Sequence, residues 1–246
     1  STTGCTATMT GSASVSGNPL PTVYTVSGGG SYCSGGAGLH ILLSGSAVGI
    51  NYQLYRGTTP VVLLSGTGSG LDFGLQALAG YYTVTATNVS TLCTSSMSGS
   101  ATISITPLPV VFSVTGGGSY CSGNAGVSIG LSGSNSGINY QLYNGSLAVG
   151  GVVSGTGAAL SFGTYTTSGT YEVVASDGVT SCTSNMSGSA NVFVNALPVT
   201  YSVTGGGGYC NGGSGVHIGL SGSTSGIAYQ LYNGTTPVGS FVTGTG

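Results

Sequence analysis

The chain has 246 residues, of which 49 are glycine and only 2% are charged, with one Lys or Arg against three Asp or Glu. Nucleic-acid binding needs many Lys and Arg side chains, so the composition excludes a nucleic-acid-binding protein. Acid–base catalysis needs several titratable groups in one place, so the composition also argues against an enzyme. No stretch approaches the roughly 20 apolar residues that span a membrane as a helix, so we expect no membrane insertion.

The predicted elements, taken in chain order, are short β-strands. Residues 39–43 keep their odd positions apolar, which indicates a strand with one buried face. The strand at residues 50–55 runs into a hairpin turn, and its later copies end in Asn144-Gly145 and Asn233-Gly234, which favour such turns. A glycine-rich loop is expected around Cys33, and no segment has helical periodicity. Further strands are expected at residues 22–26, 61–64, 71–73, 80–86 and 101–105.

Two series of cysteines divide the chain into repeats. We call Cys33, Cys121 and Cys210 the opening cysteines; each follows a run of glycines and a tyrosine, at spacings of 88 and 89 residues. The closing cysteines have the same spacings, and each precedes a Met-x-Gly-Ser-Ala motif; they are Cys5, Cys93 and Cys182. A Leu-Pro dipeptide begins each period. We therefore predict the C-terminal part of a repeat at residues 1–19, complete repeats at 20–107 and 108–196, and the N-terminal part of a further repeat at 197–246.

About seven short strands in each repeat predict an all-β protein of tandem immunoglobulin-like β-sandwiches of about 88–89 residues. Residues 80–86 and 169–175 share a Gly-x-Tyr-x-Val-x-Ala pattern that resembles the tyrosine-corner strand of such domains. Together with the opening Cys-x-Gly-Gly and the later cysteine, this pattern resembles the Ig-like tandem repeats of large secreted adhesins and surface filament proteins of Bacteroidota-type, gliding-related bacteria. The resemblance implies an extracellular, secreted protein with a structural or adhesive role.

Six cysteines in periodic positions predict disulfides in an oxidising compartment. We expect bonds within each repeat, Cys33–Cys93 and Cys121–Cys182, because one domain then completes itself while folding. Cys5 and Cys210 would find partners outside residues 1–246. The opening and closing loops lie at opposite ends of a sandwich, so the inter-repeat bond Cys33–Cys182 stays open as the alternative. A bond across the Leu-Pro boundary, Cys93–Cys121, would have to span about two domain lengths.

The remaining titratable residues form no recognisable site. His40 and His217 share a repeat position that alternation places on the surface, and the middle repeat has Ser128 there. Asp72, Glu172 and Asp177 occupy non-equivalent repeat positions, so they cannot build a repeated calcium site, which needs several oxygen ligands in one place. We expect no cofactor, no metal and no catalytic residue.

Sugar is the modification that the sequence favours. Four asparagines match the N-glycosylation pattern, namely Asn88, Asn144, Asn185 and Asn233. Glycan on Ser or Thr is a further expectation, because a surface so poor in charge favours self-association.

The sequence therefore predicts a non-enzymatic extracellular structural protein, in which tandem repeats form a stalk or a helical filament at the bacterial surface. Its partners would be neighbouring repeats and other protomers. The alternative is an adhesin whose repeats bind glycans or host surfaces directly, with exposed Tyr rings stacking on sugars and Asn and Gln side chains bonding to hydroxyls.

Overall fold

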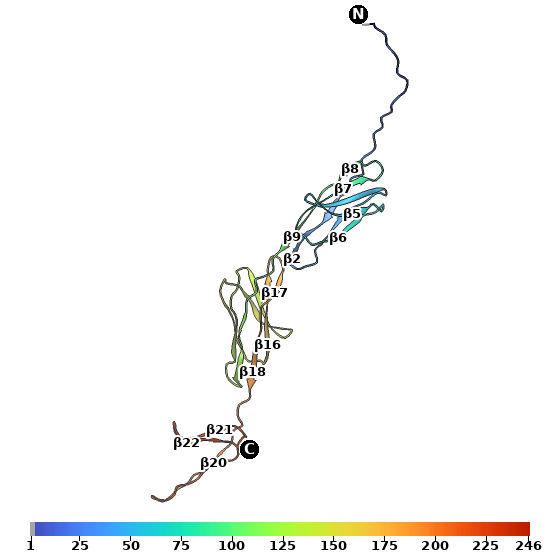
Figure 1. The fold of residues 1–246 in the computed structure, drawn as a ribbon. Helices are drawn as coiled ribbons and strands as arrows, with labels where there is room; N and C mark the ends of the chain where they lie inside the picture. The colour runs from blue at the N-terminus through green and yellow to red at the C-terminus, as the bar shows by residue number, and fades with distance from the viewer. Residues whose placement is uncertain (1–2) are drawn as a thin grey trace. The chain divides into compact units, whose positions relative to one another are not determined.

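The computed structural model describes residues 3–246, which form β-strands joined by turns and loops. The chain divides into two compact units. The first contains the residues up to Val110 together with Ser176–Ser184, and the second contains Val111–Ala175 and Asn185–Gly246 (Figure 1). Within residues 3–246, no helix is long and apolar enough to cross a membrane.

The first complete repeat consists of two facing sheets. Within each sheet neighbouring strands are antiparallel, except that β2 runs parallel to β9, beside which it lies (Figure 1). One sheet has the order β1 (Val26–Gly28), β3 (Leu39–Leu43), β6 (Leu71–Gln76). The other has the order β2 (Gly30–Cys33), β9 (Ala101–Thr106), β7 (Gly80–Asn88), β4 (Ile50–Arg56), β5 (Thr59–Ser65), with β8 (Thr94–Ser96) paired to β7.

The second complete repeat has the same strand order. Its smaller sheet is β10 (Val114–Gly116), β12 (Val127–Leu131), β15 (Leu160–Tyr165). Its larger sheet is β11 (Gly118–Cys121), β18 (Ala190–Asn195), β16 (Gly169–Asp177), β13 (Ile138–Asn144), β14 (Leu147–Ser154), with β17 (Thr183–Asn185) paired to β16.

Alternation along the strands builds one apolar core between the two sheets of each repeat. In the first repeat, Ile41 and Phe73 from the smaller sheet join Leu54, Val84 and Ile103 from the larger one. The side chains on the other face of the same strands are mostly polar and at least partly exposed, as period-2 alternation requires. Each complete repeat is thus an immunoglobulin-like β-sandwich, which confirms the predicted all-β fold class.

In each complete repeat, the glycine run before the opening cysteine carries the chain from one sheet to the other. Gly28, Gly29 and Gly30 have φ values of 96°, 72° and 126°, which favour glycine over residues with a side chain. A Cβ at Gly28 would lie 2.2 Å from the His40 carbonyl oxygen, and one at Gly116 would lie 2.0 Å from that of Ser128. The segment that the sequence indicated as a loop therefore leaves β1 and continues directly as β2.

Two tyrosines in each repeat fix its local geometry. Tyr82 is 1% exposed, and its hydroxyl donates a hydrogen bond to the Leu78 carbonyl at 2.7 Å; the Tyr171 hydroxyl donates to Thr167 in the same way at 2.8 Å. This is the tyrosine corner that the sequence indicated. On the neighbouring strand, the hydroxyl of fully buried Tyr52 accepts a hydrogen bond from the Ala47 amide at 3.0 Å.

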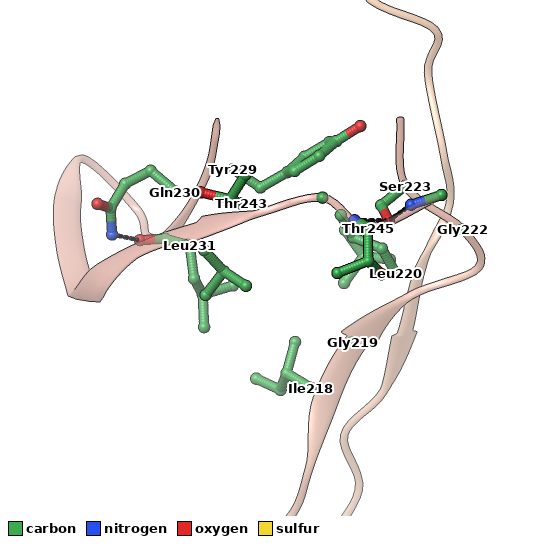
Figure 2. A pocket seen from close by; sticks show the side chains of 14 residues that line it. Ile218, Gly219, Leu220, Gly222, Ser223, Tyr229, Gln230, Leu231, Thr243 and Thr245 are labelled. Atoms are coloured by element: carbon green, nitrogen blue, oxygen red, sulfur yellow. Dashed lines mark hydrogen bonds between the residues drawn. The ribbon is translucent and has the colours of Figure 1, made fainter. Parts of the chain in front are cut away.

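Residues 197–246 contain strands equivalent to β1, β3, β4 and β5 of the first complete repeat. Their strands are β19 (Val203–Gly205), β20 (Ile218–Leu220), β21 (Ala228–Asn233) and β22 (Thr236–Thr243). Ile218 is 52% exposed, whereas its equivalents Ile41 and Ile129 are 0% and 1% exposed. An apolar hollow of about 510 Å³, lined by Ile218, Leu220, Leu231 and others, therefore lies open where the complete repeats have core (Figure 2).

Replacing Tyr82 with Phe tests the tyrosine corner. The change leaves the Leu78 carbonyl without its donor, so we expect the unfolding free energy of the first repeat to fall by about 1 kcal/mol. The matched control is Tyr81→Phe, because the neighbouring Tyr81 is 55% exposed. Urea unfolding of the two variants checks the prediction, and equal midpoints would contradict it.

Candidate functional site

The feature with definite chemistry is a disulfide that joins two different repeats. Cys33, the opening cysteine of the first complete repeat, is bonded to Cys182, the closing cysteine of the second, with a Cα–Cα distance of 5.6 Å. The two bonded cysteines are 149 positions apart along the sequence. Closing a loop of this length lowers the entropy of the unfolded chain by an amount equivalent to about 5 kcal/mol at 25 °C in the chain-entropy treatment.

The predicted bonds within each repeat, Cys33–Cys93 and Cys121–Cys182, are therefore wrong, and the inter-repeat alternative is the one that forms. The physical reason is strand order. In the parallel pairing of β2 with β9, Cys33 lies opposite Thr106, the last residue of β9, whereas Cys93 lies in the loop between β7 and β8, beyond the other end of β9. A strand of this length spans about 20 Å, and a disulfide needs Cα atoms within about 7 Å.

The other four cysteines are unpaired among the described residues. Cys5, Cys121 and Cys210 are exposed, and Cys93 is half-buried. Cys182 is 1% exposed, although Cys93 occupies the same repeat position. The additional burial of Cys182 thus accompanies its bond to Cys33. The expected partners of Cys5 and Cys210 outside residues 1–246 stay a prediction.

A tight loop presents the closing cysteine in both complete repeats. In the first, the Asn88 amide donates to the Cys93 carbonyl at 2.9 Å, and the Asn88 side-chain oxygen accepts from the amides of Ser90 and Thr91. The residue before the cysteine, Leu92, has a φ of 58°.

In the second repeat, Asp177 takes the place of Asn88. Its carboxylate accepts hydrogen bonds from the amides of Val179 and Thr180 at 2.8 and 3.0 Å, and these bonds hold the pKa of Asp177 below its ordinary value. Ser181, before Cys182, has a φ of 60°. The loop therefore has the same geometry around a bonded cysteine as around an unpaired one.

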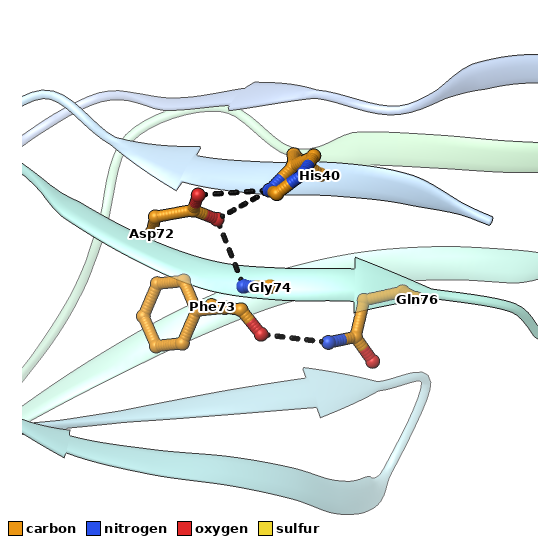
Figure 3. Close-up of polar contacts among 5 residues, drawn as sticks. All are labelled: His40, Asp72, Phe73, Gly74 and Gln76. Atoms are coloured by element: carbon orange, nitrogen blue, oxygen red, sulfur yellow. Dashed lines mark hydrogen bonds and ion pairs between the residues drawn. The ribbon is translucent and has the colours of Figure 1, made fainter. Parts of the chain in front are cut away.

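His40 and Asp72 form an exposed side-chain contact across β3 and β6 (Figure 3). The His40 Nδ1 atom lies 2.8 Å from one carboxylate oxygen and 2.9 Å from the other, and the Gly74 amide donates to the same carboxylate at 2.8 Å. The hydrogen bonds from His40 and from the Gly74 amide lower the pKa of Asp72. In the second repeat the Ser161 hydroxyl accepts the corresponding amide hydrogen bond, from Gly163.

This pair is therefore a local surface feature of one repeat. The exposed positions of His40 and His217 agree with the surface placement predicted from alternation. Within residues 3–246, no group of three or more His, Cys, Asp and Glu side chains is placed to hold a metal ion.

Three glutamines that an adhesin could use for sugars already bond to their own sheet. Gln53 donates to the carbonyls of Leu54 and Val62 beside a β-bulge. Gln141 and Gln230 make the equivalent pair of bonds in their repeats. This recurring contact satisfies carbonyl groups where the strand register shifts, so it has a structural role.

The four asparagines of the glycosylation pattern differ in their surroundings. Asn88 is half-buried and caps the closing loop, and Asn144 is the last residue of β13, with its side-chain amide 3.4 Å from the Ser168 carbonyl. Asn185 and Asn233 are exposed. Attached glycan stays a prediction, and the last two positions are the more accessible.

Comparison with protein-family models and with curated proteins found no match. Among solved structures, the chain is similar to murine CEACAM1b, with 15% identity over 70% of this chain and 100% of that chain, at a TM-score of 0.36. Fibronectin(III)-like modules of Clostridium thermocellum CbhA align over 71% of this chain and 95% of theirs, with 14% identity and a TM-score of 0.36. The four N-terminal Ig domains of Dscam1 isoform 4.44 align over 92% of this chain and 68% of theirs, with 11% identity and a TM-score of 0.22.

The strand order and the tyrosine corners, rather than these alignments, define the class of protein. The chain consists of tandem immunoglobulin-like β-sandwich repeats, and a disulfide joins the two complete ones.

Replacing Asp177 with Asn tests the closing loop. Because the folded pKa of Asp177 lies below its ordinary 3.8, its contribution to stability is fully present above about pH 4 and is lost as the pH falls toward the folded pKa. Asn88 shows that asparagine supports the same loop. We therefore expect Asp177→Asn to unfold like the parent chain at neutral pH and to lose less stability in acid.

The contrasting variant is Asp177→Ala, which removes both amide contacts and should be less stable than the parent at neutral pH. Thermal unfolding at about pH 7 and about pH 3 compares the three chains above and below the ordinary pKa of an aspartate. An Asn variant as unstable as the Ala variant at neutral pH would contradict the assignment.

Proposed function

We propose that this protein is a non-enzymatic structural repeat protein, secreted to the cell surface, whose tandem Ig-like domains form a stalk or a filament. The observation that carries the proposal is the bond between Cys33 and Cys182. A covalent link from one repeat to the next has no use in a set of independent binding modules, whereas it supports an array that must stay continuous.

Three further observations support this function. Disulfides persist in oxidising, extracellular compartments. The near absence of charge allows chains to pack side by side without electrostatic repulsion. In an array of stacked repeats, each repeat contacts mainly its neighbours, so the partners of this protein would be further repeats and further protomers. The resemblance to surface repeat proteins of Bacteroidota-type bacteria points in the same direction.

Electron microscopy of native material tests the proposal. We expect fibres in which continuous chain density passes from repeat to repeat. Binding of the isolated two-repeat fragment, residues 20–196, to a glycan array would instead support the adhesin alternative. Globular particles without fibres, together with glycan binding, would overturn the structural function.

Attached sugar is a separate expectation of the same proposal. Exposed sheet edges without charge favour edge-to-edge pairing, and glycan on Ser, Thr or an exposed Asn would block that contact and restore hydration. Intact mass spectrometry of native material should therefore give a mass above that of the bare polypeptide. A mass equal to the bare chain would reject the glycan and favour edges that are buried within the assembly.

A further inference from the structure

We propose that the Cys33–Cys182 bond is one member of a series, in which the opening cysteine of every repeat bonds to the closing cysteine of the repeat that follows. Under this rule Cys121 bonds to the closing cysteine of a repeat that completes residues 197–246. Cys93 forms its disulfide with the opening cysteine of a repeat that precedes residue 20. This inference does not depend on the filament function, because it concerns the pairing of the cysteines alone.

The strand that contains the opening cysteine has the same pairing around Cys121 as around Cys33. The two parallel strand pairs have the same register, with Cys33 opposite Thr106 and Cys121 opposite Asn195. The next amide donates across to the neighbouring strand at 2.8 Å in both repeats, from Ser34 to Thr106 and from Ser122 to Asn195. The backbone of Cys121 thus has the same strand pairing and neighbouring hydrogen bond as that of Cys33, but Cys121 is exposed and unbonded.

The tyrosine before each opening cysteine holds this strand from a second direction. The Tyr32 hydroxyl donates to the Ala77 carbonyl, and the Tyr120 hydroxyl donates to the Thr166 carbonyl. These contacts tie the strand to the loop after β6 or β15, and they are the same beside the bonded Cys33 and the unbonded Cys121.

The loop that contains the closing cysteine has the same backbone geometry around Cys93 as around Cys182. The amide of Asn88 donates to the Cys93 carbonyl at 2.9 Å, as the amide of Asp177 does to that of Cys182. The residues before the two cysteines share a left-handed conformation, with φ values of 58° and 60°. Cys93 is half-buried in this loop, and Cys182 becomes fully buried where it is bonded.

Each bond of the series forms by thiol–disulfide exchange with a disulfide oxidant. The thiolate of one cysteine attacks the oxidant and releases one reduced thiol, and the thiolate of the second cysteine then attacks the mixed disulfide and releases the other. Two protein thiols are oxidised, two electrons reduce the oxidant to two thiols, and the two protons pass to those thiols.

A chain extended by one half-repeat tests the rule. Gly246 is equivalent to Gly157, so the sequence of residues 158–196 is appended after Gly246, which supplies a copy of Cys182 to the third repeat. The chain is folded with oxidised glutathione, alkylated, digested with pepsin and mapped by mass spectrometry without reduction.

We expect Cys121 to bond to the appended cysteine and to lose its reactivity toward the alkylating agent. Cys93 should stay reactive in the same sample, because the extension supplies no opening cysteine before it. In the matched control, serine replaces the appended cysteine and Cys121 should again be alkylated. A non-reducing gel distinguishes a bond within one chain, which gives a monomer, from a bond between copies.

A second chain keeps the test decisive if the appended half-repeat does not fold. There, a full duplicate of residues 108–196, a repeat that folds in this structure, replaces residues 197–246. A bond between the appended or duplicated closing cysteine and the opening cysteine of its own repeat would overturn the proposal. So would full alkylation of Cys121 in both chains.

Discussion

The crossing of the chain from one sheet to the other at Gly28, Gly29 and Gly30 is the constraint on which the rest of each repeat depends. Three consecutive residues adopt positive φ there, and the backbone passes so close to the His40 carbonyl that no side chain fits at Gly28. The crossing lets one short segment contribute a strand to both sheets, and it sets β2 parallel to β9. That parallel register carries Cys33 beyond reach of the closing cysteine in its own repeat. The glycine crossing therefore decides which closing cysteine Cys33 can reach.

Residues 197–246 show which contacts of a repeat form between near neighbours in the sequence and which require all strands of the sandwich. The amide of Thr224 donates to the Tyr229 hydroxyl at 2.9 Å, as Ala47 donates to Tyr52 in a complete repeat, and the hairpin of β21 and β22 is in place. The smaller sheet, by contrast, has only two of its strands there, and Ile218 is half exposed. Turn chemistry and hydrogen bonds between near neighbours thus specify the first half, whereas the apolar face is covered only when strands equivalent to β15, β16 and β18 are present.

Much of this fold follows from the sequence because alternation and the repeat period are both strong signals. They predict most of the strands, such as β3, β4 and β7, and the tyrosine corners at Tyr82 and Tyr171, whereas the strand expected at residues 22–26 begins only at Val26. The disulfide could not be derived in the same way, because pairing depends on where strands end in space. The glycine-rich sequence predicts a loop at the segment of β2, and period-2 alternation gives no indication of its parallel pairing with β9. The signal that could have favoured Cys33–Cys182 was topological: the first and last loops of a sandwich lie at opposite ends.

The closed loop between Cys33 and Cys182 also has a mechanical consequence. When a chain is pulled at its ends, tension passes through the shortest covalent path, and here that path goes across the disulfide and bypasses the intervening segment. The 149 positions between the two cysteines would add about 500 Å of contour length if they were unfolded and fully extended. While the bond is intact, none of that length can be drawn out, even if one sandwich loses its fold under load. For residues 33–182, extensibility is thus set by the redox state of a single sulfur–sulfur bond rather than by the strength of the β-sheets.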